Sequence, residues 1–123
     1  MTTQTATTIT LGARELELSM PSSAAVQIEI MQSAATVSSV HRTRLVAASI
    51  GLTCKRVERM TKVTFEGHGY DLIAYGGAMF DALIDAGVPL DDVLTAGAIA
   101  LGFVAENNRF VEAMGAVKGE QGN

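Results

Sequence analysis

The sequence predicts a mainly α-helical single domain that begins with a β-hairpin and continues through about four helices. Apolar residues make up 48% of the 123 residues and aromatic residues only 5%, so the core is built from aliphatic side chains and methionine. Apolar residues recur at helical spacing along most of the chain and alternate with polar residues only near the N-terminus. A chain of this length has the size of one domain, which we place over residues 1–123.

The N-terminal region is predicted to form the hairpin. Apolar and polar residues alternate on both sides of a link of about three residues that contains Gly12. The alternating apolar residues are Ile9, Leu11, Leu16, Leu18 and Met20. A lone hairpin is marginally stable in water, so its apolar face must pack on the helices or on another chain. We expect residues 1–8 and 118–123 to be disordered tails.

Helix-start residues follow the hairpin. A serine hydroxyl can cap the first turn of a helix that we predict over Ser23–Ser38. A second helix is predicted over Arg42–Ile50, with its end at Gly51 because a residue without Cβ takes the left-handed conformation easily. A short helix over Lys55–Met60 is predicted within an otherwise polar and irregular stretch.

The next two helices have the clearest apolar patterns. One is predicted over Tyr70–Ala86, with its end at Gly87. The other is predicted over Leu90–Ala105, and two aspartates in its first turn lie at the positive end of the helix dipole. Because this helix is apolar on almost every side, it must be covered on most sides, and we predict that it is an interface element. A last amphipathic segment is predicted over Arg109–Val117.

Four glycines interrupt these two helices. Gly76 and Gly77 lie inside the first of them, and Gly97 and Gly102 inside the second. Each is unfavourable by about 1 kcal/mol relative to alanine in a helix interior. Either these glycines let another backbone approach closely, or Gly76 and Gly77 mark a kink or break.

The sequence contains no recognisable catalytic constellation. His68 lies between two glycines with Glu66 and Asp71 nearby, but this segment matches neither a nucleophile elbow nor a phosphate loop, and His41 is the only other histidine available as a metal ligand. We predict a flexible loop there, and neither enzymatic activity, a cofactor nor a metal site. The single Cys54 is interpreted as a small buried apolar residue, and a chain without an internal disulfide is expected in a reducing cytosol.

Charge is distributed unevenly along the chain. The net charge of −4 argues against general affinity for nucleic acid, and no apolar run approaches the roughly 20 residues that cross a bilayer. Basic residues concentrate within Arg42–Lys62, and acidic residues within Asp71–Asp92. The two regions form either complementary surfaces for a partner or another subunit, or an ordinary solvated exterior.

Four segments of the chain form a recognisable series: residues 8–16, Met20–Ser23, Tyr75–Leu83 and Ala86–Gly97. Together they resemble small proteins encoded among the tail genes of tailed bacteriophages. Their order resembles that of a tail assembly chaperone. This resemblance implies a protein of the host cell cytoplasm that coats the tape measure protein and keeps its long apolar helix soluble until tail tube subunits replace it.

The predicted partner-binding residues form a groove between the helices predicted over Tyr70–Ala86 and Leu90–Ala105. They are Met79, Phe80, Leu83, Leu94, Leu101 and Phe103. Such a groove holds a client helix at i, i+3, i+4 and i+7 anchors. We expect other phage tail proteins, the tape measure or the tail tube, and further copies of this chain as partners. The alternative is a structural virion component, such as a head–tail connector or tail completion protein that forms a ring.

Overall fold

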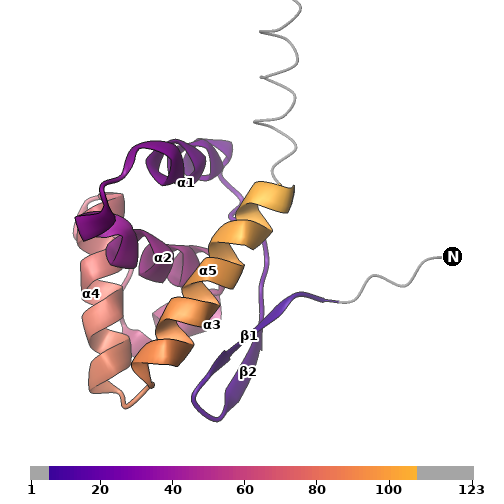
Figure 1. Cartoon of the computed structure of the whole chain (residues 1–123), viewed down its shortest axis with the longest axis vertical. Helices are drawn as coiled ribbons and strands as arrows, with labels where there is room; N and C mark the ends of the chain where they lie inside the picture. The colour runs from indigo at the N-terminus through magenta and orange to yellow at the C-terminus, as the bar shows by residue number, and fades with distance from the viewer. Residues whose placement is uncertain (1–5, 108–123) are drawn as a thin grey trace, which may run out of the picture.

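The computed structural model describes residues 6–107 of the chain. Within them, a two-stranded hairpin precedes five α-helices, and the predicted fold class is confirmed (Figure 1). The elements are β1 (Thr8–Leu11), β2 (Arg14–Glu17), α1 (Ala24–Thr36), α2 (Ser39–Thr53), α3 (Lys55–Thr61), the 3-10 turn η1 (Glu66–His68), α4 (Leu72–Asp85) and α5 (Leu90–Asn107). The segment predicted over Arg109–Val117, and residues 1–5 and 118–123, lie outside the described residues.

The hairpin packs on the helices, the first of the two alternatives that the sequence left open. Its strands are antiparallel, and Leu11 pairs with Arg14, so the link has two residues rather than about three. Gly12 in this link has a φ of 64°, a left-handed conformation that glycine adopts without steric cost. The hairpin lies against α5 through β1, and its alternating leucine and isoleucine side chains are buried. Thr8, which we expected in a disordered tail, pairs with Glu17.

The helix α2 lies between α4 and α5 and contacts both (Figure 1). Every residue from 45 to 51 in it is buried. The glycines allow these close approaches: a Cβ on Gly76 would overlap the carbonyl of Arg44, and one on Gly97 would lie 2.6 Å from Val46 Cβ. The close-approach alternative therefore holds for Gly76 and Gly97, and α4 continues through its glycines without a break.

The prediction that the second helix ends at Gly51 is wrong. The helix α2 begins at Ser39 and continues to Thr53, and Gly51 is buried within it. A Cβ at this position would overlap the Tyr75 hydroxyl of α4, so the glycine serves helix packing rather than helix termination. Cys54, which follows the helix, is buried as predicted.

The start of two helices is set by side-chain caps. Ser23 Oγ accepts a hydrogen bond of 3.3 Å from the Val26 amide, which confirms the predicted start of α1. Asp71 caps α4 by accepting bonds of 3.1 Å from the amides of Ile73 and Ala74. Because this carboxylate satisfies the first free amides, α4 begins at Leu72, slightly later than we predicted.

Candidate functional site

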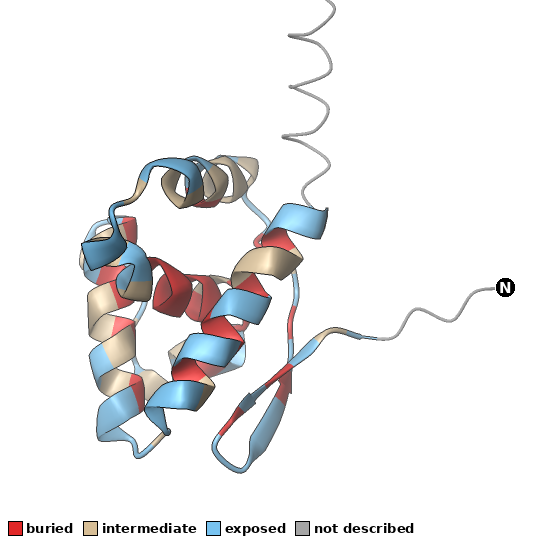
Figure 2. Cartoon of the chain, viewed as in Figure 1, coloured by how far each residue is buried: buried red, intermediate tan, exposed pale blue. Residues whose placement is uncertain are grey.

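The helix α5 is buried along one side only. Its residues against the core are Val93, Ala96, Gly97, Ala100 and Val104. Figure 2 shows buried and exposed residues alternating along α5, as expected for a helix that lies on the outside of the fold. Leu90 is 51% exposed, Ile99 39% and Leu94 38%, so apolar side chains of this helix remain open to solvent. These side chains are open to a partner, and the interface role of this helix stays a prediction.

Two apolar stripes flank the buried sides of α4 and α5. On α5, Leu90, Leu94 and Leu101 follow i, i+4, i+11 spacing and so share one side of the helix. On α4, the stripe at i, i+7, i+11 consists of Ile73, Phe80 and Ile84. Ile84 is 37% exposed, and Leu101 is half-buried, as are Ile73 and Phe80. Each stripe thus lies at the boundary between core and solvent.

The two stripes lie on the same face of the molecule. At roughly 100° per residue, each is displaced by about a quarter turn, in the same rotational sense, from the buried side of its helix. The helices α4 and α5 run in opposite directions on either side of α2 (Figure 1). In antiparallel helices on a common support, the same displacement brings the stripes to the same face. We call this set, Ile73, Phe80, Ile84, Leu90, Leu94 and Leu101, the α4–α5 surface.

Three of the six predicted partner-binding residues belong to this surface, namely Phe80, Leu94 and Leu101. The placement of Met79 and Leu83 in a partner groove was wrong, because both are buried in the core with 0% and 1% exposure. They lie on the side of α4 that packs inward, where Met79 Sδ is 3.6 Å from the Thr61 hydroxyl.

The last predicted residue, Phe103, lies on another side of α5. It is nine residues after Leu94, which is half a turn around the helix, and it is half-buried. The prediction missed Ile73, Ile84 and Leu90. A signal for Leu90 and Ile84 was present, since each is four residues from a predicted member of the surface.

Acidic side chains border the α4–α5 surface. Asp81, Asp85 and Asp91 are exposed, and the side chain of none of them bonds to another described residue. Two other acidic side chains of this region have structural partners. Asp71 caps α4, and Asp92 Oδ2 accepts a bond of 2.8 Å from the Gly12 amide. The three unpartnered carboxylates are thus available to a binding partner.

The outer side of α3 has the opposite charge. Its exposed cations are Lys55, Arg56 and Arg59 within the helix and Lys62 at the C-cap. The only carboxylate of this helix, Glu58, is turned inward: its Oε2 accepts bonds from the Tyr75 hydroxyl at 2.8 Å and the Phe65 amide at 3.1 Å. Burial, and then the bond to Glu58, raise the pKa of Tyr75 above its ordinary value. We call the four cations the α3 cationic face.

The predicted separation of charge is incomplete. Arg44 lines a shallow hollow on α4 together with Asp71 and Asp81, so one basic residue of the middle region lies among the acidic ones. The guanidinium of Arg44 also lies 3.0 Å from His41 Nδ1. The α3 cationic face remains distinct because it lies on another helix.

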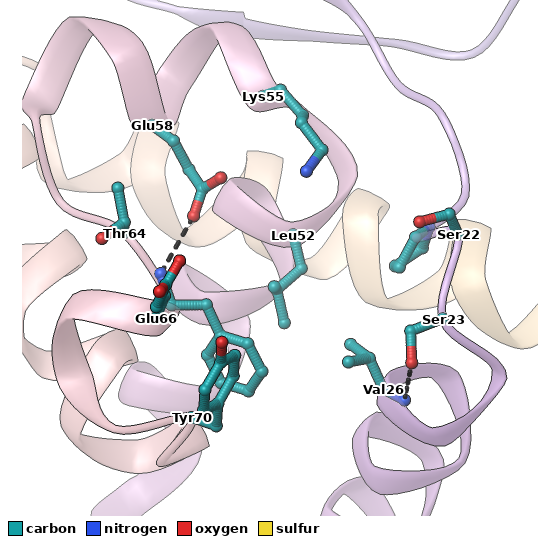
Figure 3. Close-up of a pocket in the computed structure, with 11 residues that line it drawn as sticks. Ser22, Ser23, Val26, Leu52, Lys55, Glu58, Thr64, Glu66 and Tyr70 are labelled. Carbon is teal, nitrogen blue, oxygen red and sulfur yellow. Dashed lines mark hydrogen bonds between the residues drawn. The ribbon is translucent and has the colours of Figure 1, made fainter.

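A second hollow of about 330 Å³ lies beside α3 (Figure 3). Lys55, Glu66 and Tyr70 line it, and Figure 3 shows Glu58 bonded to the backbone at Phe65 rather than directed at a ligand. His68, which precedes Tyr70 in the chain, has its Nδ1 3.0 Å from the Thr64 carbonyl oxygen. The side chains of Glu58 and His68 therefore bond to the local backbone.

The described residues contain no group of three or more His, Cys, Asp or Glu side chains placed to hold a metal ion. No helix in the described part of the chain has both the length and the apolar character needed to cross a membrane. Comparisons of the chain with family models, with curated proteins and with solved structures find no match.

Proposed function

We propose that this chain is a non-enzymatic tail assembly chaperone that holds an apolar helix of its client on the α4–α5 surface. The observation that carries the proposal is the pair of apolar stripes on α4 and α5. Leu90, Leu94 and Ile84 are more than one-third exposed there. Apolar area in water is unfavourable by about 25 cal/mol per Å², so covering these side chains favours a complex.

The arrangement of the helices suits a helical client. The helix α2 is enclosed between α4 and α5 and supports both, so the stripes are held in place before a client arrives. A client helix meets such stripes through anchors at i, i+4 and i+7. Contacts of this kind depend on apolarity and shape, so they tolerate sequence change along a long client. The sequence resemblance supports the tape measure protein, or tail tube subunits, as that client.

Co-expression with the tape measure protein from the same gene cluster tests the proposal. The chain should raise the soluble fraction of the tape measure protein, and the double variant Leu90→Ser, Leu94→Ser should lose this effect. Val40→Ser is the matched control, because Val40 is 76% exposed but lies on α2, outside the α4–α5 surface. A tape measure protein that stays insoluble beside the chain, or that is soluble alone, contradicts the proposal.

The second candidate is a ring-forming virion component, such as a head–tail connector or tail completion protein. The observation that favours it is the presence of two exposed surfaces of opposite charge, the α3 cationic face and the carboxylates Asp81, Asp85 and Asp91. Two different surfaces of this kind can join in a head-to-tail contact between copies of the chain. Sedimentation of the chain without a client distinguishes the two. A closed ring that dissociates at high salt favours this candidate, and a monomer contradicts it.

A further inference from the structure

We propose that the α4–α5 surface accepts an amphipathic helix that carries lysine or arginine beside its apolar stripe. This inference rests on the proposed function and adds the chemistry of the client. It starts from the position of the acidic residues. Asp81 is three residues before Ile84, and Asp91 is three residues before Leu94. Each aspartate therefore lies about 60° further around its helix than the neighbouring apolar residue, on the outer border of the surface.

A helix bound on the α4–α5 surface would have acidic residues along both of its sides, one set from α4 and one from α5. One carboxylate lies outside the α4 stripe and one outside the α5 stripe, while Asp85, the last residue of α4, adds a third near the turn that joins the helices. One basic residue, Arg44, lies at the α4 border, where it lines the hollow with Ile73 and Asp81, and its guanidinium lies 3.0 Å from His41 Nδ1. A helix on the apolar stripes therefore has carboxylates on both sides.

The end of α4 has no cation of its own to offset its carboxylates. The C-terminal end of a helix carries partial negative charge, so Asp81 and Asp85 near the end of α4 are unfavourably placed. The last turn of α4 contains no basic residue to offset them. A cation supplied by a partner offsets this repulsion, and a partner with acidic flanks increases it. Charge complementarity thus selects a basic helix over an acidic one.

Two synthetic helices provide the test with the intact chain. Both are 18-residue peptides with leucine at the same i, i+3, i+4 and i+7 positions; lysine occupies the flanking positions in one and glutamate in the other. Fluorescence anisotropy measures their Kd values. The lysine peptide should bind about tenfold more tightly than the glutamate peptide, the combined effect of about three exposed charge pairs. This preference should decrease as salt screens the charges.

Two matched double variants locate the effect. Asp81→Asn with Asp91→Asn should remove most of the preference for the lysine peptide. Lys55→Gln with Arg59→Gln, on the α3 cationic face, should leave it intact. The second variant makes the chain more negative, so a nonspecific attraction to net charge would instead strengthen binding of the lysine peptide there.

The outcomes separate this inference from the proposed function. Equal binding of the two peptides, or an unchanged preference after Asp81→Asn with Asp91→Asn, overturns the charge proposal and leaves the apolar surface standing. Loss of preference in the α3 variant also overturns it. If Leu90→Ser with Leu94→Ser binds the lysine peptide as tightly as the unmodified chain, the proposed function itself fails.

Discussion

The helices α2 and α5 are both rich in apolar residues, but the fold uses them differently. In α2, residues 45–51 are all buried between α4 and α5. In α5, one side packs on α2 while Leu90, Leu94 and Ile99 remain open to solvent. The helix α5 is the more apolar of the two, yet it is the less covered. Position in the fold, rather than apolar content, therefore decides which helix can serve a partner.

The largest expected effect compares one leucine from each helix. Leu45→Ala in α2 should reduce the free energy of unfolding by about 2–5 kcal/mol, because Leu45 is fully buried and its removal leaves a cavity. Leu94→Ala in α5 should cost less than about 1 kcal/mol, because the side chain is already 38% exposed. Urea denaturation of both variants measures the difference. Equal losses would show that the two helices are equally enclosed.

A pair of glycines sharpens the comparison within α5 itself. Gly97→Ala should destabilise by about 1–3 kcal/mol, since the added Cβ meets Val46 of α2. Gly102→Ala should be neutral or stabilise by up to about 1 kcal/mol, because the added Cβ has no atom of another described element within 4 Å and alanine favours a helix. Thermal unfolding of the two variants provides the measurement. A destabilised Gly102→Ala would mean that this side of α5 is covered.

The two tyrosines test the contact between α3 and α4. Tyr75→Phe should cost about 1–3 kcal/mol, because it removes the donor to Glu58 Oε2 from a buried site against Gly51. Tyr70→Phe is the control, since Tyr70 is 60% exposed, and it should have little effect. Denaturant titrations at pH 7 compare the two.

The two tyrosine variants should also differ in how their stability depends on pH. Folding raises the pKa of Tyr75 above the ordinary value of 10.0. The phenol therefore keeps its proton more tightly in the folded chain, and its contribution to stability is lost as the pH rises above that value. Unfolding measured from pH 8 to 11 should show a smaller alkaline loss in Tyr75→Phe than in Tyr70→Phe. Identical pH profiles would contradict the raised pKa.

The smallest effect compares two neighbouring carboxylates in the first turn of α5. Asp92→Ala should cost about 0.5–1.5 kcal/mol, because it removes the bond from the Gly12 amide. Asp91→Ala should cost less, since both residues interact with the same helix dipole but Asp91 has no side-chain partner among the described residues. Differential scanning calorimetry resolves shifts of this size. A larger loss for Asp91→Ala would contradict the geometry.

Local patterns were sufficient to predict the hairpin and the main helices. Period-two alternation placed β1 and β2, and the serine cap placed the start of α1. The role of Gly51 was not predictable in this way, because it depends on Tyr75, which is 24 positions away and on another helix. A glycine that ends a helix and a glycine against which a helix packs look alike when only neighbouring residues are considered.

Only three of the six predicted partner-binding residues belong to the α4–α5 surface, because its limits also depend on contacts between helices. On α4, Met79 and Phe80 are adjacent in sequence and about 100° apart around the helix. Periodicity assigns both to one broad apolar side. The neighbouring α2 and α3 cover the part with Met79 and leave the part with Phe80 at the solvent boundary. The division between core and partner surface is thus set by tertiary packing.

The hydrogen bond between the Gly12 amide and Asp92 has a consequence for the chain during its synthesis. It joins the hairpin to the last described helix across 80 positions, so the hairpin finds its final support only after α5 has been synthesised. At about 5–20 residues per second, a ribosome needs several seconds to make that intervening stretch. Throughout this interval Ile9 and Leu11 have no α5 to cover them. A chain interrupted before α5 consequently displays an uncovered apolar hairpin, a form prone to aggregation.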